Sequence, residues 1–213
     1  MVAHADVDRQ VAPSAEVAAS LKFWLSSPGV PTAVTHVVAA VSIGTVIVPG
    51  RTKLIALGAA CAALPDADVI GLRLGIPYQH VLGHRGLSHS IAFALLLAAL
   101  AIWLTQRRDA GHPPAARVGW LFFLATMSHG LLDALTDGGL GVAFFAPFQA
   151  ERYFFPWRPI AVSPISIRRL LSGEGGAVVA SELLIVWIPA ALIAISAIWF
   201  RRRRAIATPG SPG

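Results

Sequence analysis

Five apolar stretches divide the chain, at about residues 33–48, 53–72, 88–105, 118–137 and 177–200. The last stretch is the longest, and its length of roughly 36 Å as a helix is enough to cross a hydrocarbon layer of about 30 Å. The first stretch is short for that purpose. Pro65 interrupts the second stretch and predicts a kink or a stop there. Short or broken segments are tolerated where they line protein or water, so we predict an all-α, polytopic membrane bundle of the first four segments, with the fifth packed alongside.

The segments outside this bundle have different patterns. Residues 14–27, "SAEVAASLKFWLSS", place apolar side chains on one helical stripe before Pro28, which predicts an amphipathic helix on the membrane surface within an N-terminal tail, 1–29. We expect residues 30–200 to form a single membrane-embedded domain. The C-terminal segment 201–213 is expected to be a basic, disordered tail.

The stretch "FFAPFQAERYFFPWRP" (144–159) combines seven aromatic residues with charges and prolines. It is too interrupted to span a bilayer. Its composition favours an interfacial loop, with ring faces at headgroup depth and charged groups in water. A plain aromatic belt and a substrate-contacting role both remain open.

Composition supports a membrane setting. The chain of 213 residues is 55% hydrophobic and only 13% charged, whereas a soluble domain carries about 25% charged residues. The net charge of +6 includes the run Arg201–Arg204 directly after an apolar segment, which is typical of a cytoplasmic anchor rather than of a nucleic-acid partner. Cys61 is the single cysteine, so an internal disulfide is excluded. The first residues lack the pattern of a signal peptide.

Ionisable residues inside or beside the apolar segments are expensive in lipid and are functional candidates. Successive membrane segments run in opposite directions, so the start of one lies level with the end of the next. This alternation places the whole set on one side of the membrane. The set is His36, Asp66, Asp68, His84, His89, His129, Asp133 and Asp137. The opposite ends of the segments carry Arg51, Lys53, Arg107, Arg108 and Arg117 instead.

Local spacing supports this convergence. The last three residues of the set stand four apart in the fourth segment, on one drifting face of a helix. Asp66 and Asp68 would point apart on a regular helix, but Pro65 can let both face the site. His89 fits the first turn of the third segment, with Ser88 as its N-cap.

Imidazoles and carboxylates together suit Zn, Fe or Mn, and a mixed set of this size can hold one to three divalent ions, with Zn the favoured candidate. Metals held in this way lower the pKa of water to about 7 and clamp phosphoryl oxygens, which allows hydrolysis at neutral pH. Each residue also has a simpler interpretation alone. His36 could be a hydrogen-bonded core residue, Asp133 could pair with Arg85, and Asp137 could serve a turn.

Four motifs together resemble one family. "TH" (35–36), "LPDADVI" (64–70), "HRGLSHS" (84–90) and "SHGLLDALTDGG" (128–139) resemble the YdjM-like family of bacterial inner-membrane proteins, described as LexA-regulated, predicted membrane-bound metal-dependent hydrolases. That family is similar, distantly, to zinc-dependent phospholipase C and P1-type nucleases. The resemblance implies that the metal-binding positions are His36, Asp66, Asp68, His84, His89, His129 and Asp133. It also implies that Arg85 either supports these residues or contacts phosphate.

The expected function is therefore hydrolysis of a phosphate ester or phosphodiester, with a lipid among the candidate substrates, by metal-activated water. Asp68 or Asp133 would orient or deprotonate the water, and Arg85 completes the catalytic candidates. The alternative is a membrane transporter or metal-ion carrier that uses the same cluster. A scaffold whose polar residues only join helices is a third interpretation. We expect a multi-pass protein of the bacterial inner membrane, in contact with the lipid bilayer. Placing Arg201–Arg204 in the cytoplasm puts the cluster on the periplasmic side.

Overall fold

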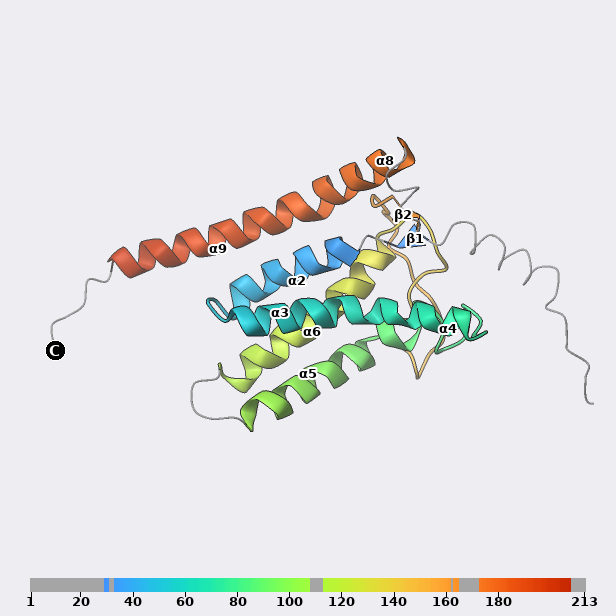
Figure 1. Ribbon diagram of the computed structural model, residues 1–213, viewed down its shortest axis with the longest axis horizontal. Helices are drawn as coiled ribbons and strands as arrows, with labels where there is room; N and C mark the ends of the chain where they lie inside the picture. The colour runs from blue at the N-terminus through green and yellow to red at the C-terminus, as the bar shows by residue number, and fades with distance from the viewer. Residues whose placement is uncertain (1–28, 31–32, 108–112, 162, 165–172, 208–213) are drawn as a thin grey trace, which may run out of the picture.

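The computed structural model describes residues 29–30, 33–107, 113–161, 163–164 and 173–207. Four helical segments that alternate in direction form a bundle (Figure 1). They are α2 (Ala33–Ile47), α3 (Thr52–Ala63) with its continuation through η1 (Leu64–Asp68) and α4 (Val69–Arg73), α5 (Ile91–Gln106) and α6 (Ala115–Ala134). A two-residue strand, β1 (Gly29–Val30), pairs antiparallel with β2 (Ser163–Pro164). The predicted membrane helical bundle is confirmed.

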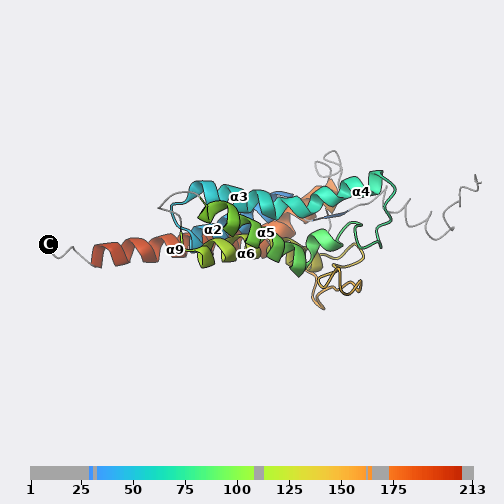
Figure 2. The same ribbon diagram turned by 90° about the horizontal axis from the view of Figure 1, so that it is seen from below.

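The fifth segment is one long rod that lies along α2 (Figures 1 and 2). It consists of α8 (Gly173–Glu182), a π-helical turn η3 (Leu183–Trp187) and α9 (Ile188–Ala207). Polar bonds join it to α2: the hydroxyl of Thr35 donates to Glu182 Oε2 at 2.7 Å and accepts from Trp187 Nε1 at 2.7 Å. Such bonds between helices help to hold a bundle together in lipid. The prediction that the fifth segment packs alongside the other four is confirmed.

Small side chains let α2, α3 and α6 approach one another closely. Ala40, Ala59, Ala62 and Ala125 form one buried cluster between α2, α3 and α6. A larger cluster that includes Leu54, Leu121 and Phe122 fills the rest of the core. Two helices of the described chain, Thr52–Leu72 and Gly175–Arg204, are long and apolar enough to cross a membrane. The outward faces of the rods keep large apolar side chains exposed, as expected for a surface solvated by lipid.

The structure tests two expected boundaries. At Pro65 the regular α-helix is interrupted as expected: α3 ends at Ala63, and η1 carries the chain through the proline as a 3-10 turn that continues into α4. The helix of the fifth segment runs past residue 200 to Ala207, so a disordered tail from 201 was wrong for its first seven residues. Arginine is a good helix former, and cations stabilise the C-terminal end of a helix dipole. The predicted surface helix at 14–27 lies outside the described residues, as does 208–213.

Candidate metal centre

The predicted His and Asp side chains meet at the end of the bundle where α2 begins and α6 ends. The third element there is η1, and the fourth is η2 (Leu87–His89), which precedes α5. Five of the seven predicted metal-binding residues are buried, namely His36, His84, His89, His129 and Asp133. Asp66 and Asp68 keep side-chain exposures of 19% and 9%. The structure thus brings all seven to one end of the bundle, with an edge open beside η1.

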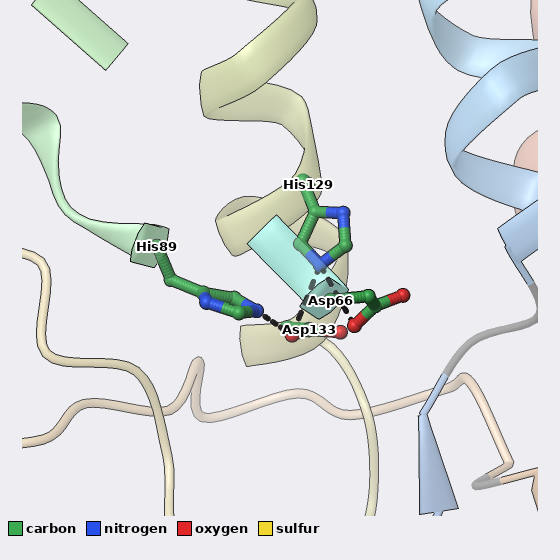
Figure 3. A group of neighbouring side chains, drawn as sticks. All are labelled: Asp66, His89, His129 and Asp133. Carbon is green, nitrogen blue, oxygen red and sulfur yellow. Dashed lines mark ion pairs between the residues drawn. The ribbon is translucent and has the colours of Figure 1, made fainter. Parts of the chain in front are cut away.

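Asp66, His89, His129 and Asp133 form a compact set, which we call the inner group (Figure 3). His89 Nε2 lies 3.1 Å from Asp133 Oδ2, and His129 Nε2 lies 3.3 Å from Asp66 Oδ1 and 3.7 Å from Asp133 Oδ2. None of these imidazole nitrogens or carboxylate oxygens forms a hydrogen bond, although all of them are buried. Buried polar atoms are nearly always hydrogen-bonded. Their convergence is therefore what a donor set for a cation requires.

The spacing of the inner group fits a shared metal ion. Tetrahedral ligands at 2.0–2.2 Å from a zinc ion lie about 3.4 Å apart, and the contacts within the inner group range from 3.1 to 3.7 Å. His36 lies at the border of this group: its Nε2 is 3.9 Å from Asp133 Oδ1, and its ring stacks on that of His129 at a centroid distance of 3.6 Å. Both ring nitrogens of His36 are buried without a hydrogen bond.

Asp68, His84 and His89 form a second set, the Asp68 group, which includes one shorter contact. His84 Nδ1 lies 2.6 Å from Asp68 Oδ1, and His89 Nδ1 lies 3.2 Å from Asp68 Oδ2. The first distance is that of a hydrogen bond rather than of two ligands on one ion. Asp68 therefore orients both rings through Nδ1 and directs each Nε2 away from itself, as carboxylates beside metal-bound histidines do.

Two further contacts complete this support. The backbone carbonyl of Ala62 lies 2.6 Å from His129 Nδ1, which fixes that ring as Asp68 fixes the other two. The hydroxyl of Ser88 donates to Asp68 Oδ2. The predicted N-cap role of Ser88 was wrong, because α5 begins at Ile91 and Ser90 accepts from the Phe93 amide at 3.1 Å.

Arg85 is the least expected feature of the site. Its side chain is fully buried, its backbone has a φ of 61°, and its Nε lies 3.2 Å from Asp133 Oδ2. Its Nη1 donates to the carbonyl of Gly138 at 3.0 Å and to the hydroxyl of Thr136 at 3.3 Å. The guanidinium thus holds Asp133 and the turn after α6. This geometry matches the supporting role that the resemblance implied, and it leaves the guanidinium inside the protein rather than facing a phosphate.

A substitution at Gly139 tests whether the position of Arg85 matters for metal binding. Its φ is +92°, and an added Cβ would lie 2.5 Å from Arg85 Nη1. Gly75 has a similar φ of +81° with nothing within 4 Å, so it is a matched control for backbone strain alone, which costs about 1–2 kcal/mol. We expect Gly139→Ala to lower metal affinity at least tenfold and Gly75→Ala to leave it unchanged, as measured by titration of the purified chain with Zn²⁺. Equal affinities in both variants would contradict a positioning role for Arg85.

The composition of residues 144–159, which we call the aromatic loop, predicted that its charged groups lie in water. Arg152 does not follow this prediction. It is half-buried, and it donates to the carbonyls of Tyr78 at 2.7 Å and His84 at 3.0 Å, so it ties the loop to the segment before α5. Burial lowers the pKa of Arg152 and raises that of Tyr78 to about 12. Sequence patterns could not reveal this clamp, because its acceptors are backbone carbonyls.

His89 lies between two carboxylates: its Nδ1 faces Asp68 and its Nε2 faces Asp133. These negative groups favour a positive charge at this place, which a divalent ion would supply. Asp137 stays outside both groups. Its amide donates to the carbonyl of Ile160 at 3.0 Å, in keeping with a turn residue.

Fold and site together define a multi-pass membrane helical bundle with a buried His/Asp cluster that could hold a metal ion. The chain belongs to the YdjM family, since the family model described as "YdjM inner membrane protein" matches residues 32–205. It is similar to "Inner membrane protein YbcI" of Escherichia coli (strain K12), with 37% identity over 182 residues that cover 81% of this chain and 99% of the relative. No solved structure matches the chain. The predicted family and the inner-membrane location are confirmed.

Proposed function

We propose that this inner-membrane protein is a metal-dependent hydrolase of a phosphate ester or phosphodiester. The observation that carries the proposal is the inner group, whose buried nitrogens and oxygens face one another without hydrogen bonds. Asp66, His89, His129 and Asp133 would hold the ion, with His36 beside them. A divalent ion bound there would lower the pKa of a water molecule and stabilise negative charge on phosphoryl oxygens.

The Asp68 group would accept the proton of the attacking water. His84 bonds to Asp68 through Nδ1, and its Nε2 is buried without a hydrogen bond. A carboxylate that fixes an imidazole in this way makes the opposite nitrogen a suitable base for water. Asp68 thus acts on the water through His84 in this proposal, and Asp133, held by Arg85, stays with the ion.

An apolar groove next to the site supports an amphiphilic substrate. It has a volume of about 550 Å³ and is lined by residues of α5, including Ile91 and Leu95, and of the aromatic loop, including Phe144 and Phe148. The Ile91 amide, two residues after His89, donates to the carbonyl of Phe144 at 2.9 Å. Phe148 is 91% exposed, which suits a ring at headgroup depth. An acyl chain in this groove would place a phosphate group near the cluster.

Hydrolysis of bis(p-nitrophenyl) phosphate by the full chain in detergent tests the proposal. We expect activity that a chelator abolishes and added Zn²⁺ or Mn²⁺ restores. His84→Gln should lower kcat by about 10²–10⁴-fold while metal content stays within twofold. His80→Gln is the matched control, because His80 is exposed and outside both groups.

Two outcomes would contradict the proposal. Activity that persists in the chelator would exclude the metal, and full activity in His84→Gln would exclude its role as the base. Bound metal without turnover on any phosphoester would favour the metal-ion carrier instead.

A further inference from the structure

A second groove lies at the opposite end of the bundle from the His/Asp cluster. It has a volume of about 570 Å³ and runs between the start of α3 and the end of α5. Arg51, Thr52 and Lys53 line its mouth, and Leu54, Leu57 and Leu104 line its wall. We call it the basic groove. It combines cations and hydrocarbon within one depression.

The cations at its mouth have no counter-charge among the residues that the structure describes. Arg51 and Lys53 are both exposed, and neither forms an ion pair with any described residue. The ends of α5 and α9 at this side of the bundle contribute Arg107 and Arg201–Arg204. No Asp or Glu occurs among the described residues 44–56, 100–107, 113–120 and 196–207 that form this end. The local field therefore favours an anion.

Two arginine–tryptophan pairs place this end at a lipid–water boundary. The guanidinium of Arg107 lies 4.1 Å from the Trp103 ring on α5, and that of Arg203 lies 4.0 Å from the Trp199 ring on α9. Tryptophan is enriched at the headgroup level of membranes, and arginines there lie on the aqueous side. The mouth of the basic groove is thus at the depth of lipid phosphates, and its leucine wall extends toward the acyl region.

We propose that the basic groove binds an anionic phospholipid. Its phosphate would contact Arg51 and Lys53, and one acyl chain would lie against Leu54, Leu57 and Leu104. The apolar wall favours a lipid over free phosphate, and the described residues that line the groove include no carboxylate to match the cation of a zwitterionic headgroup. Arg51 and Lys53 each attract an anionic headgroup. Together they predict a preference of roughly thirtyfold for an anionic over a zwitterionic lipid.

Lys and Arg are enriched on the cytoplasmic side of inner-membrane proteins, so the proposal predicts that the basic groove opens to the cytoplasmic leaflet, with the His/Asp cluster toward the periplasm.

Lipid titration of the full detergent-purified chain, followed by native mass spectrometry, tests the site. We expect phosphatidylglycerol to bind roughly thirtyfold more tightly than phosphatidylcholine to the parent chain, and this preference to vanish in Arg51→Gln/Lys53→Gln. Leu57→Trp should fill the groove and weaken both lipids. Arg117→Gln/Arg202→Gln is the matched control, because it removes two exposed charges from the same end outside the groove, and it should change phosphatidylglycerol binding less than twofold.

Equal binding of the two lipids by the parent chain would overturn the proposal. An equal loss in the groove variant and the control variant would also overturn it, because the attraction would then come from diffuse charge. Neither result depends on whether the His/Asp cluster is catalytic, since metal content and phosphodiesterase activity are measured separately.

Discussion

Replacing His129 with alanine is expected to leave the purified protein with less than a tenth of the metal that the parent chain binds. His129 Nε2 faces both carboxylates of the inner group, at 3.3 Å from Asp66 and 3.7 Å from Asp133. Its ring is already oriented by the Ala62 carbonyl, so the parent chain loses little side-chain entropy on binding an ion. Elemental analysis per mole of chain, with a Zn²⁺ titration of the metal-free protein, measures the effect.

His80→Ala is the matched control for this loss. His80 is an exposed histidine outside the cluster, and its Nδ1 accepts from the Leu82 amide at 3.1 Å. We expect its removal to leave metal content unchanged. If His129→Ala keeps the metal content of the parent, or if both variants lose metal equally, the inner group is not the metal site.

The second large effect concerns the buried pair of Arg85 and Asp133. Arg85→Met is expected to lower the free energy of unfolding by about 3–5 kcal/mol, because it leaves the carboxylate of Asp133 buried without its partner. A divalent ion at the inner group would replace part of the lost positive charge. We therefore expect added Zn²⁺ to raise the unfolding midpoint of Arg85→Met more than that of the parent, as measured by denaturant unfolding in detergent with and without chelator.

Arg152→Met separates this effect from the loss of any internal arginine. Arg152 also bridges two segments, but its hydrogen bonds to the described residues are all to backbone carbonyls. Its removal should destabilise the chain without changing how Zn²⁺ alters the midpoint. A parent-like stability for Arg85→Met, or the same Zn²⁺ response in both variants, would contradict the coupling of Arg85 to the metal site.

The architecture and the location of the cluster could be predicted from sequence because both follow from apolar periodicity. Segments of known length that alternate in direction place His36, Asp66, His89 and Asp133 at one end without any knowledge of packing. Which residues face the ion and which orient other side chains could not be predicted. Whether Asp68 faces an ion or two imidazole Nδ1 atoms depends on ring orientation, which spacing does not encode.

Other features depend on contacts across the fold. Arg85 is fully buried and its backbone has a φ of 61°, and its position in "HRG" requires neither. Glu182 was not singled out, although it is fully buried and accepts from Thr35, the neighbour of His36. A glutamate within the apolar stretch 177–200 was the available signal, but Thr35, which bonds to it, lies 147 residues away in the chain.

We propose that buried imidazoles and carboxylates from four parts of the chain bind one divalent ion at the end of the bundle. X-ray absorption at the metal edge of the purified full chain would detect these ligands. We predict a shell of nitrogen and oxygen at about 2.0–2.2 Å with the outer-shell scattering of at least two imidazoles. A protein that holds no metal either after purification or after metal is added would contradict this proposal. An ion surrounded by oxygen alone would also contradict it.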